Sequence, residues 1–178
     1  MSLLIPPLAF FGYPFKPALH RSTVSEAALA LASTGEIEAL AWEQLAVGGR
    51  LIIGEITNAI DRSTIAVFDI TDLNENVLFE LGYSIGRKKR IWLIRDKSFA
   101  GATRRWDKFA LLQPIGHARY DNSDEIFALF MRERHNEAET TIFEQLVAPC
   151  WRHPCMAMNW PMPAALIGDD DTLAVQRR

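Results

Sequence analysis

The stretch Thr64–Ile94, TIAVFDITDLNENVLFELGYSIGRKKRIWLI, decides the fold of this chain of 178 residues. Its first part, Thr64–Ile70, is almost entirely apolar and rich in β-branched and aromatic residues, which predicts a strand buried on both faces. A second apolar run, Ile91–Ile94, predicts another buried strand. The segment Asp72–Arg87 between them begins with acids and amides and continues as a helix. The order is therefore strand, polar turn, helix, strand.

The same alternation extends to both sides of this stretch. Further strands are predicted at Leu8–Tyr13, Ile37–Trp42 and Ala118–Tyr120. Helical segments of ordinary length separate these strands. Strands and helices that alternate in this way form a parallel sheet covered on both sides. The sequence thus predicts an α/β domain, a flavodoxin-like three-layer sandwich with a parallel sheet of about five strands.

Helix boundaries are predicted from capping patterns. Thr23-x-x-Glu26 and Asn122-x-x-Glu125 have the spacing of capping boxes, and Gly35 is placed to end the first of these two helices. A third helix follows Gly48-Gly49. In each of these helices, apolar residues at helical spacing form one face, which is expected to pack on the core of the domain. These residues are Val24, Ala27, Ala28, Leu31, Ile53, Ile56, Ile60, Ile126, Leu129 and Phe130.

The predicted domain covers residues 1–148. Residues 149–178 lack periodicity and are interpreted as an irregular tail or the start of a second domain. Two cysteines and His153 lie there, at a spacing that does not make a closed zinc site. The scattered basic residues and a net charge of −3 argue against nucleic-acid binding. No run of about 18 apolar residues predicts a membrane span, and the two cysteines fit a reducing cytoplasm.

Two smaller features have plain interpretations. The basic run Arg87–Arg90 (RKKR) is expected to complete the last turn of a helix. His20, His117 and His135 show no pattern of partners and are expected at the surface.

Glu80 is the leading candidate for chemistry. It falls in an otherwise apolar part of a helix, between Phe79 and Leu81, near the carboxyl end of a predicted strand. The helix dipole favours its ionised form and the apolar neighbours oppose it. A carboxylate balanced in this way suits a nucleophile or a stabiliser of an oxocarbenium ion in glycosyl transfer. The alternative is a Glu that only favours the dipole or pairs with a basic side chain.

Polar residues near the strand end are further candidates. Asp69 lies inside an apolar strand, where an unpaired acid is costly, so it is expected to bind a sugar hydroxyl or turn amides. Asp72-x-x-Glu75 is itself a capping-box pattern, so Asp72 has a capping alternative. Asn74 and Asn76 can cap the helix or contact a ligand.

The first predicted strand ends at the same sheet edge with Gly12-Tyr13-Pro14-Phe15. Gly12 permits close backbone approach, and Tyr13 or Phe15 can stack on a base. Filling of the core is the alternative for each ring. Gly48-Gly49 could let a helix begin near a phosphate, but it lacks the spacing of a known phosphate-binding motif.

The stretch from Gly49 to Asp96 resembles the superfamily that joins nucleoside 2-deoxyribosyltransferases to bacterial TIR-like NAD-cleaving domains. In those families an ELGYA-like helix follows a strand, and its Glu is catalytic. The residues that carry the resemblance are Ile56, Ile60, Asp69-Ile70-Thr71, Asn74, Asn76-Val77, Phe79-Glu80-Leu81-Gly82-Tyr83 and Lys88.

The resemblance implies that Glu80 attacks or stabilises the anomeric carbon of a ribosyl group. It also implies a ribose- and base-binding role for the loop Gly12–Phe15. From their place beside Glu80 we further expect Asp69 and Asn76 to hold sugar hydroxyls, and Asp72, Asn74 and Tyr83 to be further substrate contacts. The loop Gly-Tyr-Pro-Phe matches neither the deoxyribosyltransferase nor the TIR pattern, so the resemblance leaves the substrate open.

Three functions follow as hypotheses. The first is an N-glycosidase that cleaves the nicotinamide–ribose bond of NAD or a related nucleotide, in a bacterial antiviral defence effector that forms homo-oligomers and works with a fused or associated sensor domain. The second is a nucleoside or nucleotide 2-deoxyribosyltransferase or hydrolase. The third is a non-catalytic module that senses a nucleotide or assembles. In the first two, NAD or the nucleoside is a substrate, and no cofactor or metal is needed.

Overall fold

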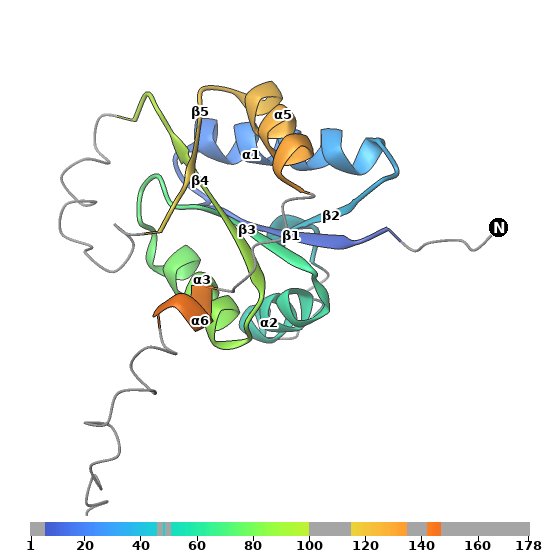
Figure 1. Cartoon of the computed structure of the whole chain (residues 1–178), viewed down its shortest axis with the longest axis vertical. Coiled ribbons are helices and arrows are strands. Elements are labelled where there is room, and N and C mark those ends of the chain that lie inside the picture. Colours follow the sequence, from blue (N-terminus) through green and yellow to red (C-terminus); the bar gives the residue numbers. More distant parts are fainter. Residues whose placement is uncertain (1–5, 46–47, 49–50, 100–114, 135–141, 147–178) are drawn as a thin grey trace, which may run out of the picture.

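The computed structural model describes residues 6–45, 48, 51–99, 115–134 and 142–146 (Figure 1). Its centre is a sheet of five strands in the order β2-β1-β3-β4-β5, with every neighbouring pair parallel. This is the flavodoxin-like order, and the predicted fold class is confirmed. The strands are β1 Leu8–Gly12, β2 Glu38–Ala41, β3 Ile65–Asp69, β4 Arg90–Asp96 and β5 Ala118–Tyr120.

Helices cover both faces of the sheet (Figure 1). The helices α1 and α5 lie on one face, and α2 and α3 lie on the other, where α6 contacts α3. Their bounds are α1 Ala18–Ser33, the 3-10 helix η1 Trp42–Gln44, α2 Ile52–Arg62, α3 Glu75–Gly86, α5 Ser123–Glu133 and α6 Ile142–Leu146.

The central strand β3 divides the core into two layers. All five of its residues are buried. Because successive side chains of a strand point to opposite faces, Ile65 and Val67 pack in the cluster with α1 and α5, while Ala66 and Phe68 pack with α2 and α3. This is why the sequence of the strand is a continuous apolar run.

The first helix begins earlier than predicted. The structure places its first residue at Ala18, directly after Pro17, so Thr23-x-x-Glu26 is not a capping box. Thr23 lies inside the helix, and its Oγ1 donates to the carbonyl of Leu19, 2.9 Å away. At the other end the helix stops at Ser33, and Gly35 follows with φ of +71°, a conformation that favours glycine.

The basic run Arg87–Arg90 does more than complete the end of α3. Lys89 Nζ donates to the carbonyl oxygens of Asp61 and Ser63, at 2.6 and 2.9 Å, where α2 ends. Arg90 donates to two carbonyl oxygens at the end of α5. The run therefore satisfies the open carbonyls of two helices and fastens them to the sheet.

Several predictions fall outside the described residues. These are the segment 149–178 with its two cysteines and His153, Gly49 and His135. Within the described part, no group of His, Cys, Asp and Glu is placed to hold a metal ion. The helices described there are all too short or too polar to span a membrane.

Candidate active site

A cavity of about 780 Å³ opens where β1 and β3 end. These two strands are neighbours, but the chain leaves β1 toward one face of the sheet and β3 toward the other, which is where ligands bind in open α/β sheets. The loop after β1, the loop after β3 and the helices α2 and α3 form its walls. The lining residues are Tyr13, Pro14, Phe15, Lys16, Trp42, Ile52, Ile53, Ile56, Asp72, Asn74, Asn76, Phe79 and Glu80.

Glu80 is the buried acid of this cavity. It lies in the second turn of α3 and is 6% exposed. Its Oε2 is enclosed and has no hydrogen-bond partner among the described residues. The residue is one of those that line the cavity. A buried carboxyl without a partner is costly, so this position is not explained by stability.

Gly12 makes room for this carboxyl. A Cβ atom added at Gly12 would lie 2.5 Å from Oε2 of Glu80 and 2.7 Å from the ring of Phe68. Both distances are shorter than non-bonded atoms tolerate. The close backbone approach predicted at Gly12 is present, and it is the Glu80 carboxyl that approaches.

Burial also sets the protonation of the acid. Desolvation raises the pKa of Glu80 from 4.5 to about 7. Near neutral pH the carboxyl is therefore divided between its ionised and its protonated form. Such a group can act as an anion beside a developing positive charge and can also exchange a proton.

One wall of the cavity is aromatic. The rings of Tyr13 and Phe15 contact the indole of Trp42, with centroid distances of 6.1 and 6.2 Å. The Arg21 guanidinium lies 4.7 Å from the centroid of the Phe15 ring. Tyr13 is buried, and Phe15 is 55% exposed. The wall therefore combines a fixed inner ring with an outer ring that a planar ligand can reach.

The loop after β3 supplies the polar wall. Asn74 is the N-cap of α3, and its Oδ1 accepts from the backbone N–H groups of Asn76 and Val77 at 3.0 and 3.4 Å. Its capping role is confirmed, while Asn76 is exposed at the cavity. Asp72 was expected to be a cap or turn residue if it does not bind substrate; it is not the cap, which is Asn74, but it lies in the turn that precedes the helix. Asp72 also lines the cavity.

Two predicted substrate contacts lie elsewhere. Asp69 is fully buried and does not line the cavity described above; its carboxylate accepts from the N–H and Oγ1 of Thr71 and from the hydroxyl of Tyr120. Of its two predicted roles, the bond to a turn amide is the one observed. Burial raises the pKa of Asp69. The Tyr83 hydroxyl donates to Asp61 Oδ2 at 3.0 Å, near the end of α2, and Tyr83 is not one of the lining residues.

Sequence reasoning missed part of the cavity wall. Trp42 follows β2 at the same sheet edge as Tyr13, so the rule that strand ends converge could have found it. Ile53 and Ile56 were expected to face the core, but Ile53 is 50% exposed and both line the cavity. No pattern in the sequence indicated that Lys16, Ile52 and Phe79 would line the cavity. His20, expected at the surface, is buried.

Comparisons with known proteins identify no family. No family model matches the chain, and no curated protein matches it. Among solved structures, the CMP N-glycosidase BcmB of Clostridium botulinum is similar at 12% identity with a TM-score of 0.48. The match covers 70% of this chain and 98% of that one. A similarity of this size does not assign a function.

Proposed function

We propose that this protein is an N-glycosidase that breaks the bond between a ribosyl C1′ and a ring nitrogen. The observation that carries the proposal is Glu80. It is a buried acid without a partner among the described residues, held at the wall of an aromatic-lined cavity at the switch point of the sheet. Stability alone gives no reason to keep a carboxyl there, whereas an oxocarbenium-like transition state needs one.

The reaction follows from the charge of this group. When the C1′–N bond breaks, its electron pair leaves with the ring nitrogen, and positive charge develops on C1′ and the ring oxygen of the sugar. The ionised carboxylate of Glu80 stabilises that charge or bonds to C1′. Water then adds to C1′ and gives up its proton to a carboxylate or to solvent.

We propose the nicotinamide–ribose bond of NAD as the bond cleaved. Nicotinamide is cationic while bound to ribose and leaves as a neutral molecule, so no acid has to protonate it. A cationic ring suits aromatic faces and nearby carboxylates. Tyr13, Phe15 and Trp42 supply the aromatic rings, of which Phe15 already has the Arg21 guanidinium over its ring. The described lining residues include two carboxyl groups, Asp72 and Glu80, and one cation, Lys16. As parts of the same proposal, the protein acts in antiviral defence and assembles with copies of itself.

One observation favours a second candidate, a nucleoside or nucleotide 2-deoxyribosyltransferase or hydrolase. A neutral purine or pyrimidine leaves more easily when it is protonated. With a pKa of about 7, Glu80 holds a proton in part of the molecules at neutral pH. The amide of Asn76 at the cavity can bond the edge of such a base.

A panel of substrates separates these candidates. The protein at high concentration is incubated with NAD, NADP, ribonucleosides and 2′-deoxynucleosides, and the products are identified by mass spectrometry. Nicotinamide from NAD is the expected product. Free base from a deoxynucleoside alone would replace the first candidate with the second.

The Glu80→Gln variant shows whether the activity belongs to this site. It is expected to release no base, while Glu75→Gln, a change of an exposed acid on the same helix, keeps wild-type turnover. Wild-type turnover in Glu80→Gln would reject the glycosidase mechanism. Ligand-dependent stabilisation that persists in Glu80→Gln, with no product from any substrate, would identify a binding module instead.

A further inference from the structure

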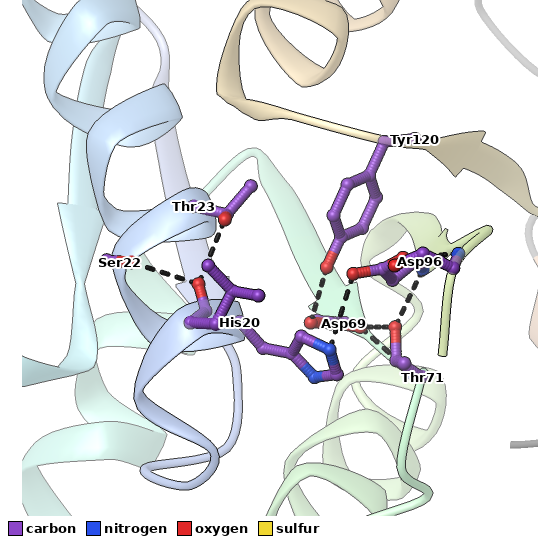
Figure 2. Close-up of polar contacts among 9 residues, drawn as sticks. His20, Ser22, Thr23, Asp69, Thr71, Asp96 and Tyr120 are labelled. Carbon is purple, nitrogen blue, oxygen red and sulfur yellow. Dashed lines mark hydrogen bonds and ion pairs between the residues drawn. The ribbon is translucent and has the colours of Figure 1, made fainter. Parts of the chain in front are cut away.

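A second group of buried polar side chains lies at the same edge of the sheet and lines no part of the cavity described above (Figure 2). Its centre is Thr71, 1% exposed, in the loop after β3. The Thr71 N–H and Oγ1 both donate to Oδ1 of Asp69, and Oγ1 accepts from the backbone N–H of Asp96 at 2.8 Å. The hydroxyl of Tyr120, from β5, donates to Oδ2 of Asp69 at 2.9 Å.

The group continues to the start of α1. The carboxylate of Asp96 lies 3.3 Å from Nε2 of His20, and its Oδ1 accepts from the N–H and Oγ of Ser98 at 2.6 and 2.7 Å. His20 is in the first turn of α1, directly after the loop that carries Tyr13 and Phe15. Figure 2 shows His20, Asp96, Thr71, Asp69 and Tyr120 converging from separate elements.

This arrangement joins the two loops that form the cavity. Thr71 holds the loop after β3, which presents Asp72 and Asn74 and begins the helix of Glu80. His20 holds the helix that follows the loop after β1. Among the described residues, His20 Nδ1 is the one buried polar atom of this group without a partner. The other buried polar atoms are hydrogen-bonded, and their bonds specify one geometry because a displacement would leave a buried group unpaired.

The loop after β3 also carries a strained residue. Leu73 has φ of +48°, which is uncommon for a residue with a side chain. It lies between Asp72 and Asn74, the two residues that the loop presents to the cavity. Such a conformation persists when the surrounding structure determines it. Here the Leu73 N–H donates to the carbonyl of Ile70 at 3.4 Å, and the bonds of Thr71 and the Asn74 cap hold the residues on either side.

We propose that Thr71 is a positioning residue, which acts with Asp69 and Asp96 to hold the loop of Asp72 and Asn74 and the start of α3 in the geometry that the cavity requires. The effect of Thr71 on the rate of base release rests on the proposed function. Thr71 needs its hydroxyl for this role, because the oxygen is a donor to one partner and an acceptor from another. Valine has the same shape and can do neither.

The test compares three variants. Thr71→Val removes the hydroxyl, and Thr71→Ser keeps it. Thr64→Val is the matched control, since Thr64 directly precedes β3 at the opposite end of the strand, is exposed, and its Oγ1 donates to the carbonyl of Leu8 at 3.0 Å. In folded Thr71→Val we expect kcat/KM for base release to fall about tenfold or more, as expected when reacting groups are misplaced. Thr71→Ser and Thr64→Val should stay within about twofold of wild type.

A second readout does not depend on turnover. The Glu80 carboxyl is titrated by carbon NMR in each variant. In wild type and Thr71→Ser its midpoint should lie near 7, because burial raises its pKa to about that value. In Thr71→Val we expect a lower midpoint, because a displaced α3 admits water to the carboxyl. We also expect shifted amide signals from Asn74 and Asn76.

The outcomes are distinguishable. Wild-type kcat/KM and an unchanged Glu80 titration in folded Thr71→Val would overturn the positioning role and leave the proposed function standing. If the wild-type protein releases no base, the proposed function fails, and the NMR comparison of Thr71→Val with Thr71→Ser decides the positioning role alone. If Thr71→Val does not fold, Tyr120→Phe is used instead, because it removes one hydrogen bond to Asp69. A smaller fall in kcat/KM and a smaller downward shift of the Glu80 midpoint in this variant would support the positioning role. Wild-type values of both would overturn it.

Discussion

Replacing Glu80 with glutamine should make the protein more stable at alkaline pH while abolishing its activity. Glutamine has nearly the same shape as glutamate and cannot ionise. The carboxyl it replaces is 6% exposed, and its Oε2 has no partner among the described residues. Ionisation of this group in the folded protein is therefore opposed by burial and is compensated by no hydrogen bond to Oε2.

The magnitude follows from the pKa of Glu80, which burial raises from 4.5 to about 7. One pKa unit corresponds to about 1.4 kcal/mol, so the ionised carboxyl costs the folded state about 3 kcal/mol. Well below pH 4.5 the group is protonated in both states and there is no cost. The folded state binds the proton more tightly, so its stability relative to the unfolded chain falls as the pH rises from 4.5 through 7.

The assay is urea unfolding of the wild type and Glu80→Gln across this pH range. The difference in the free energy of unfolding between them should grow in favour of Glu80→Gln by about 2–3 kcal/mol from pH 5 to pH 8. Glu75→Gln, which changes an exposed acid of the same helix, should show a constant difference. A difference for Glu80→Gln that does not change with pH would show that the carboxyl is hydrated or paired, and the reasoning would fail.

Three further predictions concern the same region. Gly12→Ala should reduce base release about tenfold or more, because the new Cβ would lie 2.5 Å from Oε2 of Glu80. The control is Gly82→Ala, where a Cβ meets nothing within 4 Å. Equal rates of base release in the two variants would contradict the account. Base release should increase with pH through about 7 as Glu80 ionises, measured as kcat/KM; a rate that is flat from pH 5 to 9 would mean that another group carries the charge. Tyr83→Phe should unfold at a slightly lower urea concentration than wild type, since it removes the bond to Asp61, but it should keep its KM for NAD; a large rise in KM would place Tyr83 in the substrate site.

Much of the fold was predictable because its determinants are local. The run Thr64–Ile70 is apolar at every position but its first and Asp69, and only a central parallel strand buries both faces in this way. The alternation of strands and helices then predicts a parallel sheet with helices on both faces. The cap at Asn74 and the position of Glu80 near the carboxyl end of the strand were also predictable, because they too depend on residues close to each other in the sequence.

The remaining differences depend on tertiary contacts. Asp69 and Asp72 both flank the end of β3, and no local pattern says which one faces the cavity. In the structure, Tyr120, which lies 51 positions from Asp69 in the sequence, donates its hydroxyl to the Asp69 carboxylate. Asp69 is therefore bonded inside the protein, and Asp72 faces the cavity. In the same way, His20 is buried because Asp96 of β4 lies opposite it, and spacing along the chain cannot indicate such a pair.

The most direct test of the account is the structure of Glu80→Gln with uncleaved NAD bound. We predict that the ribose attached to nicotinamide lies in the cavity, with its C1′ about 3–3.5 Å from the side chain of residue 80, a distance at which groups react. A bound dinucleotide whose C1′ lies out of reach of residue 80, or one that occupies another surface, would contradict the central claim.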